Sequence, residues 1–281
     1  MGTPPAAPLD ARSEGWQAAC VALLGTRGCA VVEGVLSPER CAAVSAALVR
    51  ARARVREEAG PAALDAARDR GDAMIRFLEV HEPIFLETLA LPPVLGIVDA
   101  VLGGDAVLRF QMGNAMPGAG DGGGPPTQPR SWHRNFGRVP GRPGITLEVA
   151  LVLEDLGPGT GCPVVAPGSH LRADAPPPDA WEAVAEPLPA RAGAMQVLAG
   201  TLWHRESPNL DARERLTLVQ QYALPWVRPY FDYPRMLGEE RLRSLPERTR
   251  RLLGGDARPP ATPREFYGLP GERTFRARGG A

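Results

Sequence analysis

The sequence predicts a mainly β fold with flanking helices in a single domain. Residues 106–223 consist of short apolar segments separated by Gly- and Pro-rich turns, which is typical of a sandwich or barrel. The residues before them show the apolar spacing of helices, and no internal repeat divides the chain. We expect one domain over residues 1–281, with a loose leader at 1–12, a β core at 106–223 and an Arg- and Pro-rich extension at 225–281.

The N-terminal part begins with a strand that we expect over residues 28–36. The tripeptide Ser37-Pro38-Glu39 then provides an N-cap, a proline at the first helical position and an acidic first turn. These signals predict a helix that ends near Glu58. A second helical stretch is expected over residues 83–102, with a restart at its Pro-Pro pair.

The β core is expected to hold short strands with one long loop after the first of them. The predicted strands cover residues 106–116, 145–155, 162–166, 194–198, 202–206 and 213–223. The segment from Pro117 to Arg130 is dense in Gly and Pro, and two interpretations stay open for it, a lid over a pocket or a connector. In the extension we expect one helix over residues 238–253 and irregular structure after Gly255.

Composition excludes several classes of protein. The chain has 32 Lys+Arg and 32 Asp+Glu residues, which argues against a nucleic-acid-binding surface. All of these cations are Arg, and together with 32 Gly and 31 Pro they indicate a GC-rich genome, so the arginine excess alone assigns no role. The four cysteines form no C-x-x-C pair, and no signal peptide or membrane span is evident. We therefore expect a cytoplasmic protein that binds neither nucleic acid nor membrane.

Histidine is rare in this chain, and two of the four histidines suggest metal chemistry. His204 lies on a predicted strand, and His133 follows the Gly- and Pro-rich segment, far from it in the sequence. Two such imidazoles can converge on a metal if each is on a strand of one barrel. Non-haem iron oxygenases hold the metal with two histidines and one carboxylate, which leaves open positions for a co-substrate and dioxygen. The usual pattern is His-x-carboxylate followed by a distant His, whereas here His133-Arg134-Asn135 supplies an amide. Alone, this pattern is a weak signal.

The surrounding blocks resemble the phytanoyl-CoA dioxygenase family of Fe(II)/2-oxoglutarate-dependent oxygenases. Trp132-His133 is similar to the first ligand strand of that family, and Gly161–His170 is similar to its Pro-Gly-Ser-His segment. The segment His204–Asn209 resembles the distal ligand, with Arg215 eleven positions after His204. The resemblance runs from the first strand to about Tyr222. It implies a double-stranded β-helix core, which is a jelly-roll of the cupin type.

The same resemblance assigns roles to individual residues. His133 and His204 would ligate Fe(II), and Arg215 would bind the distal carboxylate of 2-oxoglutarate, which suits a planar guanidinium. Gln111 is a second candidate for a co-substrate contact. We interpret His170 as structural in spite of its place in a motif.

Asn135 departs from the family, which has aspartate at this position, and three explanations stay open. Asn135 or water completes a weakened site, or Glu148 substitutes, since Glu148 shares a strand face with Thr146 and Ala150. In the third explanation the iron chemistry has been lost. An engineered replacement of aspartate is also open. Halogenase relatives carry Ala or Gly here, so we rank halogenation lower, because Asn fills the space for halide.

The leading hypothesis is an Fe(II)/2-oxoglutarate-dependent oxygenase that uses dioxygen to hydroxylate or desaturate a small organic molecule in bacterial secondary metabolism. The alternative is a catalytically silent jelly-roll that binds a metabolite or a protein. Arg134, Arg138 and Arg205 lie beside the expected ligands, which suggests either an acidic substrate or solvated arginines at a barrel mouth. The sequence determines neither the substrate nor the oligomeric state.

Overall fold

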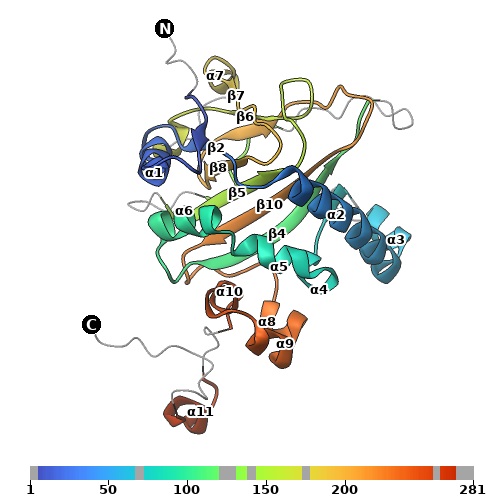
Figure 1. The fold of residues 1–281 in the computed structure, drawn as a ribbon, viewed down its shortest axis with the longest axis vertical. Helices are drawn as coiled ribbons and strands as arrows, with labels where there is room; N and C mark the ends of the chain where they lie inside the picture. Colours follow the sequence, from blue (N-terminus) through green and yellow to red (C-terminus); the bar gives the residue numbers. More distant parts are fainter. Residues whose placement is uncertain are drawn as a thin grey trace.

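The computed structural model describes residues 6–66, 73–119, 131–137, 144–172, 178–255 and 260–269 (Figure 1). Its main sheet has the strand order β1 (Leu9–Asp10), β2 (Cys29–Glu33), β8 (Met195–Ala199), β5 (Thr146–Val152), β10 (Arg215–Ala223), β4 (Val107–Met116) and β3 (Met74–Ile75). A smaller sheet has the order β7 (Glu186–Pro187), β6 (Pro163–Val165) and β9 (His204–Glu206). The predicted fold class, mainly β with flanking helices, is confirmed.

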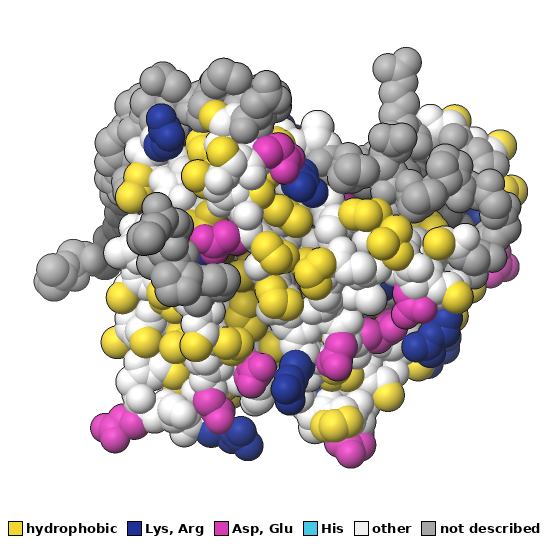
Figure 2. All heavy atoms as spheres, turned by 90° about the horizontal axis from the view of Figure 1, so that it is seen from above, with side chains coloured by type: hydrophobic (Ala, Val, Ile, Leu, Met, Phe, Trp, Pro, Cys, Tyr) yellow, Lys and Arg dark blue, Asp and Glu magenta, His cyan; other side chains and the backbone are white. Residues whose placement is uncertain are grey.

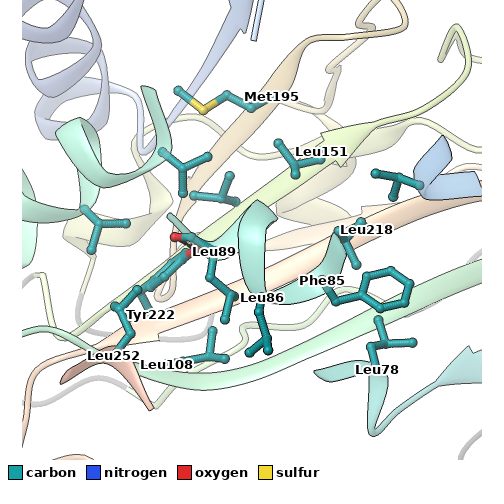
Figure 3. Close-up of a cluster of buried hydrophobic side chains, with 14 of the residues drawn as sticks. Leu78, Phe85, Leu86, Leu89, Leu108, Leu151, Met195, Leu218, Tyr222 and Leu252 are labelled. Carbon is teal, nitrogen blue, oxygen red and sulfur yellow. Dashed lines mark hydrogen bonds between the residues drawn. The ribbon is translucent and has the colours of Figure 1, made fainter. Parts of the chain in front are cut away.

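Helices cover one face of the main sheet (Figure 1). They are α1 (Trp16–Thr26), α2 (Pro38–Ala59), α4 (Leu78–His81), α5 (Pro83–Leu89) and α6 (Pro92–Leu102). Figure 3 shows how Leu78, Phe85 and Leu89 from these helices meet strand residues such as Leu108 and Leu218. All of these side chains are fully buried, so apolar burial holds the helices on the sheet.

Two of the predicted helical regions form for the reasons that the sequence gives. The Ser37 side chain accepts a hydrogen bond from the Arg40 backbone N–H at 3.2 Å, and α2 follows with Pro38 at its start. The stretch over residues 83–102 is divided into α5 and α6, which restarts at Pro92, as expected. These predictions are confirmed.

Strand β10 presents its residues alternately to two different environments. Leu216, Leu218 and Tyr222 belong to the apolar cluster under the helices. Arg215, Thr217 and Val219 line a cavity on the other face, between the two sheets. All nine residues of β10 are nevertheless buried, because both faces of this central strand are covered.

Both ends of the chain depart from the expectations. Leu9–Asp10 pairs in parallel with β2, so this part of the expected loose leader is a short edge strand. The helix expected over residues 238–253 is two helices, α9 (Glu239–Ser244) and α10 (Glu247–Leu252), because Pro246 interrupts it. Where irregular structure was expected, α11 (Pro263–Tyr267) begins at Thr262, whose side chain accepts from the Glu265 N–H.

Helix α1 was not predicted, because its N-cap Gly15 provides no side-chain hydrogen bond. Several short elements were not predicted either. They are β1, β3, β7, α3 (Pro61–Ala66), α7 (Pro178–Glu182), α8 (Tyr233–Leu237) and a 3₁₀ turn (Ser169–Leu171). Residues 120–130 of the Gly- and Pro-rich segment lie outside the described residues.

No single described helix is long and apolar enough to cross a membrane, although α5 and α6, bent by 48°, reach the required length and composition together. Figure 2 shows one face of the molecule, on which side chains of both charges lie interspersed with hydrophobic ones over the coloured part.

Candidate active site

Two histidines lie side by side between the sheets. The backbone N–H groups of His133 and His204 each donate to the carbonyl of the other at 3.0 Å, so the two residues form an antiparallel bridge. Their ring centroids are 4.3 Å apart, with 52° between the ring planes. Both side chains line the cavity between the sheets, which has a volume of about 70 Å³. The structure therefore brings the two predicted metal ligands together.

Backbone carbonyls fix the tautomer of both imidazoles. Nδ1 of His133 lies 3.1 Å from the Ser131 carbonyl oxygen, and Nδ1 of His204 lies 2.9 Å from that of Leu202. Because a carbonyl only accepts hydrogen bonds, Nδ1 carries the proton in each neutral ring. The lone pair is then on Nε2, which is the arrangement that metal-ligating histidines adopt.

The third predicted ligand position contains an amide next to a carboxylate. Asn135 Nδ2 donates to Glu148 Oε2 at 2.5 Å, and both residues line the cavity. An ionised carboxylate only accepts hydrogen bonds, so Glu148 fixes which end of the amide faces it, and the amide oxygen Oδ1 points elsewhere. Glu148 also faces the cavity together with Ala150, as strand alternation predicted.

These residues fit a divalent metal only in part. Two imidazoles with lone pairs on Nε2 and one amide oxygen are a suitable donor set, but the amide adds no charge. Within the described part of the chain, no group of three or more His, Cys, Asp and Glu side chains is arranged to hold a metal ion. The site therefore fits iron as a two-histidine site with a neutral third ligand, and Asn135 is the residue that would supply it.

Arg215 lies in the same cavity and is only 5% exposed. Its Nη1 donates to Thr217 Oγ1 at 3.1 Å, and its Nη2 lies 3.6 Å from the Met116 sulfur. Gly161 allows this packing, because its φ is +76° and a Cβ there would approach the Met116 sulfur to 2.3 Å. The guanidinium is thus placed where it could bind a carboxylate inside the cavity.

Gln111 is not directed to this cavity. Its Nε2 donates to the Phe85 carbonyl at 3.1 Å and to Thr88 Oγ1 at 3.2 Å, both on α5. Its amide nitrogen thus points to the helices, because adjacent strand residues point to opposite faces, and the co-substrate contact stays a prediction. His170 is buried, with Nε2 at 3.3 Å from the Gly25 carbonyl, and burial lowers its pKa, which agrees with a structural role.

The residues next to the two histidines are held from outside by an acidic side chain of α7. Glu182 accepts hydrogen bonds from Arg205 at 3.0 and 3.1 Å and from Trp132 Nε1 at 2.7 Å. We call Glu182, Trp132 and Arg205 the outer clamp. Hydrogen bonding to Arg205 lowers the pKa of Glu182. Arg205 is therefore engaged with protein groups, which weakens its link to an acidic substrate.

Arg134 and Arg138 add little to that suggestion. The Arg134 guanidinium lies over the Trp203 ring, 4.8 Å from its centroid. Arg138 lies outside the described residues.

Further polar residues of the cavity were not predicted from the sequence, among them Glu206 and Asn114. Glu206, two positions after His204, accepts a hydrogen bond from Asn114 Nδ2 at 2.7 Å. Both side chains line the cavity. The alternation of strands β4 and β9 is the signal that could have identified them, once the inward face was known.

The comparison with known proteins places this site in a family. Residues 25–217 match the sequence profile of phytanoyl-CoA dioxygenase (PhyH). Two mycobacterial proteins, the uncharacterized protein Mb1539 of Mycobacterium bovis and the uncharacterized protein Rv1501 of Mycobacterium tuberculosis, are each 31% identical over 249 residues, which cover 89% of this chain and 90% of theirs.

Solved structures share the fold. AviO1 from Streptomyces viridochromogenes Tue57 is 25% identical with a TM-score of 0.60, over 76% of this chain and 97% of its own. The nickel complex of the non-heme monooxygenase ThoJ is 21% identical with a TM-score of 0.59, over 75% of this chain and 79% of its own. The likeness confirms the predicted double-stranded β-helix core. The chain belongs to the phytanoyl-CoA dioxygenase family, whose membership supports an oxygenase-type function.

Proposed function

We propose that the protein is an Fe(II)- and 2-oxoglutarate-dependent oxygenase that uses dioxygen to hydroxylate or desaturate a small organic molecule, in bacterial secondary metabolism. One observation carries the proposal: two imidazoles with their lone pairs on Nε2 share a cavity with a buried guanidinium. Iron and an anionic co-substrate are the pair of groups that this combination would bind.

Each residue has a distinct task in this proposal. His133 and His204 would hold Fe(II), which when bound supplies the activation of dioxygen, coupled to oxidative decarboxylation of oxoglutarate. Arg215 would bind the distal carboxylate of oxoglutarate, in a buried position where a charge-assisted hydrogen bond is strong. The Thr217 hydroxyl oxygen accepts a hydrogen bond from this guanidinium and so helps to orient it.

The Asn135–Glu148 pair determines how strongly iron would be held. The Glu148 carboxylate supplies a negative charge one hydrogen bond away from the third ligand position. A charge at that distance stabilises a cation less than a directly bound carboxylate does, because the interaction weakens with distance. We therefore expect iron affinity below that of a site with aspartate.

Variants of Asn135 and Glu148 test the proposed iron site. The single variant Asn135→Asp places two carboxylates against each other, whereas Asn135→Asp/Glu148→Gln keeps the hydrogen bond with its donor and acceptor exchanged. We expect the double variant to bind Fe(II) at least about tenfold more tightly than the wild type, since one charge moves into the ligand position. The measurements are anaerobic equilibrium dialysis of Fe(II) and succinate release from 2-oxoglutarate.

Glu148→Gln alone is the matched control. It removes the nearby charge without adding a ligand, so iron affinity should fall. Unchanged Fe(II) affinity in all three variants, or wild-type protein that binds iron but not oxoglutarate, would contradict the proposal.

A catalytically silent jelly-roll is the second candidate, and the neutral residue at position 135 favours it. It predicts that the wild type binds no iron and releases no succinate. If the double variant then gained iron binding, the cavity would be an oxygenase site that has lost its third ligand.

A further inference from the structure

A second hollow adjoins the cavity of the two histidines. It has a volume of about 180 Å³, and His133, Asn135 and Glu148 line both spaces. Its remaining walls combine aromatic rings and thioethers, contributed by Phe110, Tyr230, Phe231, Met74 and Met112, with the polar residues Arg76, Gln111 and Gln221. Aromatic faces and adaptable methionine side chains suit a flat apolar ligand. This hollow is much roomier than the space around Arg215.

One polar side chain of this hollow has an unsatisfied donor. Gln221 is fully buried, and its Oε1 accepts a hydrogen bond from Arg109 Nη1 at 2.5 Å. A guanidinium only donates, so this bond fixes Gln221 with Nε2 as its other end. Among the described residues, Nε2 of Gln221 has no hydrogen-bond partner. A buried donor without an acceptor is costly, so an acceptor on a ligand would stabilise this arrangement.

Strand register places this donor next to Glu148, which borders the third predicted ligand position. Gln221 pairs with Phe110 on one side and with Glu148 on the other. The three side chains therefore form one row across β4, β10 and β5, with an aromatic ring, an amide donor and a carboxylate in that order. Glu148 in turn accepts from Asn135, so the row ends at the third ligand position.

Arg109 connects the donor to the aromatic wall. Its guanidinium carbon lies 4.2 Å from the centroid of the Tyr230 ring and 5.2 Å from that of Phe136. Its Nη1 also donates to the Asn135 carbonyl at 3.3 Å. Arg109 is thus a positioning residue, which holds Gln221, Tyr230 and the segment of His133 in one arrangement.

Tyr230 comes from a part of the chain outside the family-matched residues 25–217. Its backbone N–H donates to the Arg109 carbonyl at 2.8 Å, which attaches this segment to β4. The Tyr230 ring stacks on Phe110, with centroids 5.2 Å apart and planes 16° apart, and the residue remains 58% exposed. The wall of the hollow is therefore built partly by residues outside the matched span.

We infer that this hollow seats the organic substrate, and that the substrate is a flat apolar molecule with an acceptor oxygen, such as a carboxylate or sulfonate oxygen, that Gln221 Nε2 binds. Gln221 is then a specificity-determining residue and Tyr230 a wall of the substrate site. The inference rests on the proposed function, because the hollow borders His133.

Two fluorescent probes test the inference without iron or turnover. The probe 1-anilinonaphthalene-8-sulfonate carries an anionic acceptor, whereas N-phenyl-1-naphthylamine has the same rings and no sulfonate. We expect Gln221→Leu to weaken sulfonate-probe binding about tenfold or more, as expected for a lost hydrogen bond to a charged group, and to leave the neutral probe within about threefold. Tyr230→Ala should weaken both probes about three- to tenfold.

Matched variants separate these effects from loss of folding. Gln220→Leu removes the adjacent buried glutamine of β10, which faces the helices and is not among the described residues that line the hollow, so the ratio of the two affinities should not change. Tyr267→Ala removes a tyrosine that is 79% exposed and should change neither affinity. Thermal unfolding monitors the folded fraction of each variant.

Three outcomes would overturn the inference: an unchanged ratio in Gln221→Leu, equal losses in Tyr230→Ala and Tyr267→Ala, or no saturable binding of either probe to the wild type. Probe binding requires no metal. If Gln221→Leu still weakens the sulfonate probe selectively but the protein releases no succinate, only the proposed function is contradicted.

Discussion

The two faces of the main sheet use the same strands for opposite purposes. On the helix-covered face, β10 contributes Leu216, Leu218 and Tyr222 to a continuous apolar core (Figure 3). On the cavity face, the same strand contributes Arg215 and Gln221, which lie among other polar groups. Both faces are buried, so burial alone does not separate stabilising residues from functional ones. The direction of the side chain does.

Buried acids show the same contrast. Glu79 of α4 is fully buried, and neither of its oxygens has a hydrogen-bond partner among the described residues. Desolvation raises its pKa to about 8, so it is mostly neutral at pH 7. On the cavity face, Glu148 and Glu206 each accept a hydrogen bond from an amide. The helix face thus tolerates an acid by protonating it, while the cavity face provides partners for its acids.

The largest expected effect is on the cavity face, in His204→Ala. Loss of one imidazole should lower Fe(II) affinity by at least about a hundredfold, since even residues that only orient a ligand contribute 10–100-fold. Succinate release should disappear, and thermal unfolding should change little. Equilibrium dialysis of Fe(II) measures the affinity, with His81→Ala as the control outside the cavity. Equal losses of affinity in both variants would remove the distinction between the faces.

On the helix face, Leu218→Ala should have the next largest effect, and on stability alone. Leu218 is fully buried in the apolar core, so the truncation should lower the free energy of unfolding by about 2–5 kcal/mol. Urea denaturation measures this loss. The neighbouring Val219→Ala faces the cavity and should cost less, because it removes fewer packed atoms. A change in iron affinity in Leu218→Ala would show that the two faces are coupled.

Glu79 gives the helix face a pH dependence. Its folded-state pKa of about 8 lies above the ordinary glutamate value of 4.5, so its stabilising contribution is complete below about pH 4.5 and is lost as the pH rises to about 8. The wild type should therefore be more stable at pH 5 than at pH 8 relative to Glu79→Gln, which lacks the titrating group. Urea denaturation of both proteins at the two pH values tests this. Parallel pH profiles would mean that Glu79 is ionised in the folded protein.

The outer clamp should give the smallest effect. Glu182→Gln removes the negative charge that Arg205 and Trp132 contact from α7. An exposed ion pair contributes less than about 1 kcal/mol, so the free energy of unfolding should hardly change. Iron affinity should fall a few-fold, because the neighbours of His133 and His204 lose a restraint. Isothermal titration with Fe(II) under argon is the measurement, and an unchanged affinity would make the clamp purely structural.

The sequence by itself determined the local features of this protein. The cap at Ser37, the restart at Pro92 and the short strands of the β core depend on neighbouring residues only. Local chemistry is sufficient for such predictions, because propensity and period act over a few residues. The resemblance to a known family then assigned the two imidazoles and Arg215 to one site.

Only the tertiary structure decided which side chains meet. In β10 both Gln220 and Gln221 are fully buried, yet Gln220 contacts the helices and Gln221 lines the second hollow. Hydropathy cannot separate such neighbours when both faces of a strand are covered, and Gln111 was assigned to the cavity for the same reason. The contact of Asn135 with Glu148 and the placement of Tyr230 depend on strand register and on long-range packing, which no local pattern encodes.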